Sequence, residues 1–167
     1  FLLPKIKCLP NGIENLNSKN FKNSNFLNER SVDILIWADN WNSSNNFCKK
    51  FLRFLNEKKV SFNVNVLGSV DLRKLQNLKK KPNVLNWVQD IDLYLADVKF
   101  LIVPEFKNFG LVNRLLDGMH AGCIVFSGDA ACDGITGFRD GIHGFKINNL
   151  ESMLDTLNEM SIDHERS

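Results

Sequence analysis

The stretch "FLIVPEFKNFGLVNRLLDGMHAGCIVF" (Phe100–Phe126) predicts the fold of this chain. Its apolar ends, FLIV and CIVF, have the continuous hydrophobicity of strands that are buried on both faces of a sheet. Pro104 ends the first run, because proline lacks the amide donor that a β ladder needs. The segment between Gly110 and Gly122 has the apolar periodicity of an amphipathic helix. A strand, a helix and a second strand in close succession indicate a parallel βαβ unit.

The same alternation of strands and helices extends in both directions. Strands are expected at residues 32–38, 62–67, 84–88, 100–103, 123–126 and 145–147. Helices are expected at residues 44–58, 70–80, 90–98 and 150–160, besides the one that follows Gly110. We therefore predict an α/β fold, a Rossmann-like, doubly wound, mainly parallel sheet of about six strands with helices on both faces. In such sheets ligands bind beyond the carboxyl ends of the strands.

The bulk composition fits one globular domain. The chain has 167 residues, 44% of them hydrophobic and 24% charged, and its net charge is +2. The basic residues are spread along the sequence and Lys79–Lys81 is expected to be a solvated loop, so we expect no nucleic-acid partner. Residues 1–31 are expected to be a lead-in or linker segment and residues 32–167 the domain. The chain starts at Phe1, and we expect an N-terminal domain to precede it.

Cysteine spacing indicates neither a disulfide framework nor a metal site. None of the four cysteines forms a C-x-x-C pair, which favours a reducing compartment and a cytoplasmic location. Cys123 lies in an apolar run and is expected to be a small core residue. His120 and Cys123 have a ligand-like spacing, but one such pair is a weak signal and we expect no metal. No apolar run has membrane-spanning length.

The helix after Gly110 has an unusual charge at its start. Arg114 lies in the first turn, where a cation opposes the helix dipole by up to ~1 kcal/mol. An anion bound there would reverse that sign, because the first-turn amides and the guanidinium would then act together. Asp117, one turn later, suits ribose hydroxyls, so a nucleoside diphosphate is indicated. The alternative is a solvated Arg114–Asp117 pair worth ~0.2–0.5 kcal/mol.

The stretch "VPEFKNFGLVNRLLDGMHAGCIVFSGDAACDGI" (residues 103–135) resembles the donor-binding half of the group 1 retaining glycosyltransferases of the GT-B fold. The matching positions are Pro104, Gly110, Arg114, Asp117, Met119 and Gly122. Three further stretches resemble the family in the expected order: "LPNGIENLN" (9–17), "NVLNWVQDIDLYLADVKFLIVP" (83–104) and "GITGFRDGIHGFKI" (134–147). The resemblance therefore covers nearly the whole chain.

The resemblance implies a role for each matching residue. Arg114 would contact the donor diphosphate and Glu105 would lie in the loop that meets the donor sugar, and these two are the expected catalytic residues. Asp117 would bind the ribose. The remaining expected donor contacts are the backbone amides of Gly110, Leu111 and Val112 and the nucleobase border formed by Trp87 and Val88.

The resemblance also implies the partners. A retaining enzyme of this kind transfers a sugar from a nucleotide-diphosphate donor to an acceptor held by the N-terminal domain, so the isolated chain is expected to be inactive. No cofactor is expected, since the nucleotide sugar is the donor substrate. Any peripheral membrane association is expected only through the N-terminal domain.

Some positions depart from the family pattern. Asp117 replaces the commoner glutamate, Gly118 replaces alanine, and "NWNSSNNF" (40–47) lacks the basic residue that many relatives carry there. A non-catalytic GT-B-like interaction module and a GT-B nucleotide-sugar epimerase therefore stay as alternatives. The segment "SGDAACDG" (127–134) is expected to be a loop that closes the crevice, with Asp129 and Asp133 as turn residues.

Overall fold

The computed structural model describes residues 29–38, 41–68, 78–106 and 112–165. They form one sheet with strands β1 Val32–Trp37, β2 Val64–Leu67, β3 Asn83–Leu85, β4 Val98–Val103, β5 Ile124–Ser127 and β6 Phe145–Lys146. Every strand pair is parallel and the spatial order is β3-β2-β1-β4-β5-β6. This confirms the predicted doubly wound parallel sheet, and the strand order reverses between β1 and β4.

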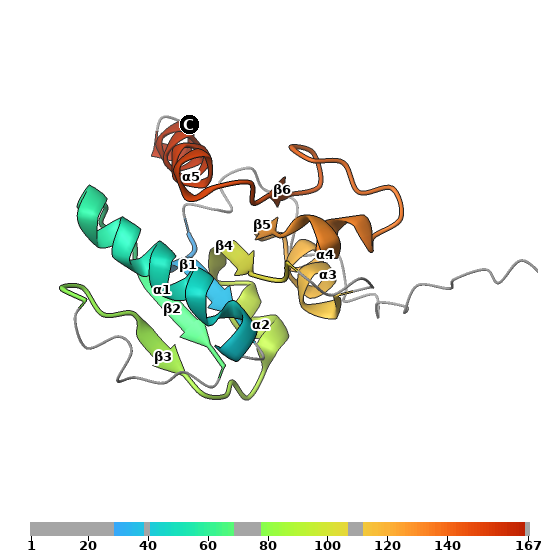
Figure 1. The fold of residues 1–167 in the computed structure, drawn as a ribbon. Coiled ribbons are helices and arrows are strands. Elements are labelled where there is room, and N and C mark those ends of the chain that lie inside the picture. The colour runs from blue at the N-terminus through green and yellow to red at the C-terminus, as the bar shows by residue number, and fades with distance from the viewer. Residues whose placement is uncertain (1–28, 39–40, 69–77, 107–111, 166–167) are drawn as a thin grey trace, which may run out of the picture.

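Helices cover both faces of the sheet (Figure 1). They are α1 Trp41–Lys58, α2 Ile91–Leu95, α3 Asn113–His120, α4 Asp129–Asp133 and α5 Leu150–Glu165. Alternate strand residues serve the two faces: Ile36 packs in one core cluster with α1 and α5, and Leu35 packs in the other with α2, α3 and α4. Both residues are fully buried, as expected for central strands covered on both sides.

Several predicted elements differ from the structure. The strand expected at residues 84–88 ends at Leu85, the helix expected at 44–58 begins at Trp41, and the helix expected at 150–160 continues to Glu165. The helix expected at residues 90–98 ends at Leu95, because Val98 already pairs with Val32 as the first residue of β4. The segment expected to be a loop contains α4, whose first turn holds Asp129 and whose buried residues include Ala131. Alanine is a strong helix former and an acid suits a helix start, so local propensity outweighed the turn signal. Most of the helix expected at 70–80 lies outside the described residues.

Gly118 explains why α3 lies so close to the sheet. It is buried in α3, and a methyl group there would lie 2.2 Å from Cδ2 of Leu101 and 3.2 Å from Cγ1 of Val125. Glycine lowers intrinsic helix stability by ~1 kcal/mol relative to alanine. In this position it also lets the helix backbone approach β4 and β5, which brings the first turn of α3 to the carboxyl ends of the strands.

Arg30, just before β1, makes hydrogen bonds at the C-terminal end of α3. Its guanidinium donates to the carbonyl of Val98 and, at 2.8 Å, to the carbonyl of Ala121. The side chain is buried and also lies 3.7 Å from Sγ of Cys123. Burial lowers the pKa of Arg30, because a charged group loses hydration there. Arg30 thus satisfies backbone acceptors where α3 ends and where β4 begins.

In the described part of the chain no helix is long and apolar enough to cross a membrane.

Candidate functional site

The candidate site lies where the strand order reverses. β1 and β4 are neighbours, with Ile36 beside Ile102, and the chain leaves their carboxyl ends toward opposite halves of the sheet. In doubly wound sheets ligands bind outside the strand ends at this point. Arg114, in the first turn of α3, reaches the end of β1: its Nη1 donates to the carbonyl oxygen of Trp37 at 3.2 Å.

Arg114 also meets the other residue that was expected to be catalytic. Its Nη2 lies 3.6 Å from Oε2 of Glu105, which follows β4. Their side chains are 16% and 12% exposed, respectively. The solvated-face interpretation is therefore wrong for Arg114. In a partly buried pair each charge needs the other, since an uncompensated buried charge is costly.

The loop that carries Glu105 is held by its neighbours. The amide of Glu105 donates to the carbonyl of Val103 at 2.8 Å. Gly128, after β5, lies against this loop, and a methyl group there would be 2.3 Å from the carbonyl oxygen of Glu105 and 2.7 Å from Cδ1 of Phe106. The Phe106 ring in turn packs on Phe47 of α1, with ring centroids 5.3 Å apart. Packing on both sides therefore sets the position of Glu105.

The start of α3 suits an anion. Its N-cap is Val112, which has extended backbone angles and no side-chain oxygen with which to cap the helix. No acidic side chain lies in the first turn of α3. The positive end of the helix dipole therefore has the cationic Arg114 beside it, and an anionic ligand would gain from both. The other expected amide donors, Gly110 and Leu111, lie outside the described residues.

Asp117 lies one turn further along α3 and is half-buried. Burial raises the pKa of its carboxyl group, the charge of Asp92 on α2 raises it further, and His120 opposes the shift. α2 and α3 are in contact, so Asp92 acts across a helix–helix boundary. The raised pKa indicates a carboxylate that gains from hydroxyl donors, because such donors stabilise its charged form.

Trp87 and Val88 follow β3 on the same carboxyl edge of the sheet. The Trp87 side chain is 74% exposed, and Val88 packs into the core beside Leu95 of α2. The structure thus places Trp87 on the surface, at the far end of the edge that holds Glu105. A backbone contact to a nucleobase stays a prediction for both residues.

The other candidates from the sequence have structural roles. Cys123 is buried and unpaired, and burial raises its pKa to about 11, so it is a core residue as expected. The described residues contain no group of three or more side chains suited to a metal.

Asp129 and Asp133 are helical residues rather than turn residues. Nζ of Lys146 in β6 lies 3.6 Å from Oδ1 of Asp129 and 2.8 Å from Oδ1 of Asp133. The contact ties α4 to the edge of the sheet. Sequence reasoning missed it, because the partners lie in different elements and no local spacing links them. It also missed Gly128, whose position directly after an apolar strand was the available signal.

The comparisons with known proteins support the fold. The chain is similar to the crystal structure of TarM, with a TM-score of 0.66 and 12% identity, over 81% of this chain and 29% of that one. It is also similar to the C-terminal domain of LpcC, a glycosyl transferase group 1 family protein from Francisella tularensis, with a TM-score of 0.60 and 14% identity. That match covers 84% of this chain and 82% of the other. No protein-family model and no curated protein matches the sequence. The expected fold is thus confirmed, since the chain shares it with the C-terminal domain of a group 1 glycosyl transferase.

Proposed function

We propose that this chain is the donor-binding domain of a retaining glycosyltransferase and that it binds a nucleoside-diphosphate sugar. The observation that carries the proposal is the partly buried Glu105–Arg114 pair, where the strand order reverses between β1 and β4. Ligands of doubly wound sheets bind at this point. The similarity to the C-terminal domain of a group 1 glycosyl transferase supports the same function.

The chemistry proposed for the site is stabilisation of a leaving diphosphate. As the bond from the sugar to the phosphate breaks, negative charge grows on the diphosphate oxygens. Arg114 and the amides of Gly110, Leu111 and Val112 would meet that charge at the positive end of α3. Glu105 would then be released from Arg114 and would face the donor sugar. This assignment needs no resident cofactor, because Arg114 and the helix supply the positive charge.

The nucleoside would lie along the same edge of the sheet. Asp117 is one turn from Arg114, at a distance that suits the ribose hydroxyls next to a diphosphate. Trp87 and Val88 would border the base. The acceptor would be held by an N-terminal domain, and the chain spans only 29% of the length of TarM. We therefore expect this chain alone to bind nucleotide and to transfer no sugar.

The direct test is calorimetric titration of the chain with UDP and with GDP. Binding is expected for one of them, and Arg114→Ala should weaken it more than Asp117→Ala, because it removes a charge-assisted contact. Arg139→Ala is the matched control, since it removes an arginine that is exposed in the segment before β6. Absence of binding at any soluble nucleotide concentration would favour a non-catalytic interaction module. A larger effect of Asp117→Ala would mean that the phosphate lies elsewhere.

A further inference from the structure

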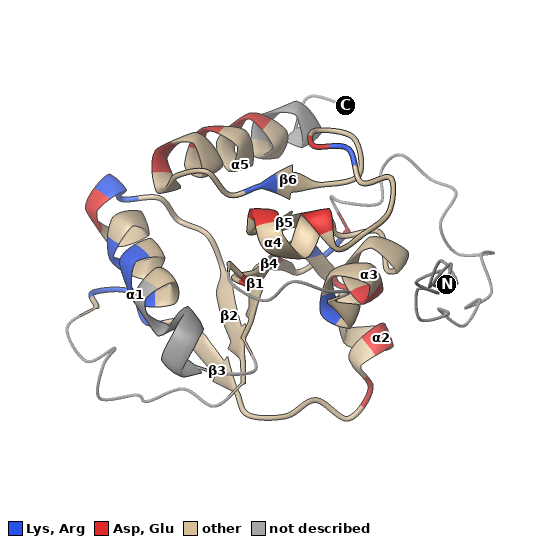
Figure 2. Ribbon diagram, turned by 45° about the vertical axis from the view of Figure 1, so that its right-hand side comes forward, with Lys and Arg blue, Asp and Glu red and all other residues tan. Residues whose placement is uncertain are grey.

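Charged residues are unevenly distributed among the described helices and loops (Figure 2). The basic face is defined here as Lys49, Lys50, Arg53, Lys58, Lys59, Lys79, Lys80 and Lys81. Glu57 is the one acidic residue within the described segments that carry this face, 47–68 and 78–82. On α5, by contrast, Glu151, Asp155 and Glu159 are exposed. The net charge is only +2 because acidic residues elsewhere, such as those on α5, offset a strongly basic side of the molecule.

Hydrogen bonds hold the two segments of the basic face together. The amide of Lys80 donates to Oδ1 of Asn56 on α1 at 2.9 Å. The Nζ of Lys80 donates to the carbonyl of Phe62 at 2.7 Å, and Nδ2 of Asn56 also donates to the carbonyl of Leu52 at 2.8 Å. The segment that carries Lys79, Lys80 and Lys81 is thus held against α1, the helix that carries Lys49, Lys50 and Arg53.

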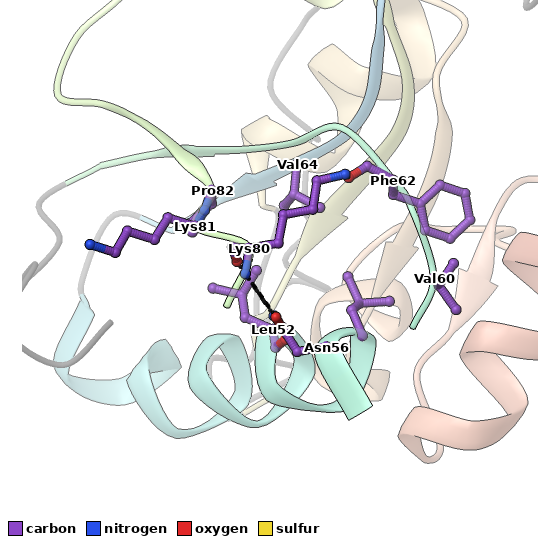
Figure 3. A pocket seen from close by; sticks show the side chains of 9 residues that line it. Leu52, Asn56, Val60, Phe62, Val64, Lys80, Lys81 and Pro82 are labelled. Atoms are coloured by element: carbon purple, nitrogen blue, oxygen red, sulfur yellow. Dashed lines mark hydrogen bonds between the residues drawn. The ribbon is translucent and has the colours of Figure 1, made fainter. Parts of the chain in front are cut away.

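An apolar pocket opens between these segments (Figure 3). Its apolar lining includes Leu52, Leu55, Phe62 and Val64, and Lys80 and Lys81 also line it. The pocket lies beside the first residue of β2, Val64, and just before β3. It is therefore at the amino ends of the strands, whereas Glu105 and Arg114 are at the carboxyl ends. A partner bound at the pocket would therefore leave the candidate site accessible.

The composition of the basic face indicates its partner. Arginine is the residue that suits bidentate recognition of individual phosphates, whereas lysine acts as a compact point charge. Seven lysines and one arginine make up this face. The exposed large apolar side chains of the described residues are Trp87, Leu93, Phe106 and Ile142, none of which lines the pocket. Phe62 lines the pocket but is half-buried, so the described residues of the face offer no widely exposed ring on which nucleic-acid bases could stack.

We propose that the basic face docks on the surface of a membrane that contains anionic phospholipid. Each lysine near such a surface adds attraction that extends over about a Debye length. The pocket would take an apolar group from the bilayer interface, where lysine stems cover apolar surface and keep their charges in water. This docking was not expected from the sequence, which placed any membrane association in the N-terminal domain. It does not depend on nucleotide binding.

The test is co-sedimentation of the chain with vesicles of phosphatidylglycerol and phosphatidylcholine, compared with vesicles of phosphatidylcholine alone. Binding is expected only to the anionic vesicles and should weaken as salt rises above about 0.15 M. Lys50→Gln and Arg53→Gln should each lower the affinity roughly fivefold. Both side chains are exposed, so the fold should tolerate the changes, and thermal unfolding checks this. Arg139→Gln removes the same charge from an exposed turn outside the basic face and should leave binding unchanged.

Several results would overturn the proposal. Equal binding to both kinds of vesicle, or no binding to either, would exclude anionic lipid as the partner. An equal loss of affinity for Arg139→Gln would show that only net charge matters. Tighter binding to a single-stranded oligonucleotide than to the vesicles would assign the face to nucleic acid instead. If a substituted chain fails to fold, the salt series and the two kinds of vesicle still decide with the unsubstituted chain.

Discussion

Replacing Glu105 by glutamine should strengthen the binding of a nucleoside diphosphate that carries no sugar. Oε2 of Glu105 lies 3.6 Å from Nη2 of Arg114 in the structure. The carboxylate therefore neutralises the guanidinium that the diphosphate is proposed to meet, and it would repel the incoming phosphate. Glutamine has nearly the same shape and no charge, so Glu105→Gln removes the charge that would compete with the ligand for Arg114.

The size of the effect follows from the distance and the burial. Two unit charges at 3.6 Å interact by about 1 kcal/mol in a water-like dielectric and by roughly 5 kcal/mol at an effective dielectric of about 20. The side chains of Glu105 and Arg114 are only 12% and 16% exposed, so their effective dielectric is below that of water. The interaction of about 1 kcal/mol is therefore a lower bound. It corresponds to about fivefold tighter binding. We therefore expect Glu105→Gln to lower the dissociation constant for UDP or GDP at least fivefold.

Isothermal titration calorimetry measures this effect, with the same ligand at one pH and one salt concentration. Glu159→Gln is the matched control, because it makes the same substitution at an exposed position of α5. The corresponding nucleotide sugar should gain less from Glu105→Gln, since Glu105 is proposed to contact the sugar. Unchanged or weaker binding of the sugar-free nucleotide would refute competition between Glu105 and the diphosphate for Arg114.

Other predictions concern pH and stability. As the pH falls, nucleotide binding should start to weaken at a pH above 4, the approximate pKa of an ordinary aspartate. The reason is that the pKa of Asp117 is raised, so its carboxylate becomes protonated at a higher pH. Asp92→Asn should move that loss to lower pH in a pH series of titrations. Gly118→Ala should lower the free energy of unfolding by ~1 kcal/mol in a denaturant melt, since overpacking against Leu101 exceeds the gain in helix propensity. A stabilised variant would contradict the close packing. Arg30→Ala should cost about 3 kcal/mol by the same assay, because it leaves buried carbonyls without a donor; a change below ~1 kcal/mol would refute this role.

Much of the fold could be predicted because buried parallel strands have a local signature. The run from Phe100 to Val103 is apolar at every position, and the structure buries all of it. The position of Arg114 at a helix start also followed from local spacing. α4 was missed because its short alanine-containing turn resembles a loop when its burial is unknown. The end of α2 was misplaced because Val98 belongs to β4 through its pairing with Val32, which is a long-range contact.

The sequence by itself determined the class of the fold, the order of its strands along the chain and the placing of Arg114 and Asp117 on one helix. These depend on periodicity and spacing within short segments. Only the tertiary structure decided what Arg114 meets. Its partners are Glu105 and the carbonyl of Trp37, the latter 77 residues away along the chain, and they meet because β1 and β4 are adjacent. The tertiary structure also decided that Lys80 lies against Asn56, 24 residues away. This contact brings the lysines before β3 next to α1. Strand order brings such residues together, and no local pattern encodes it.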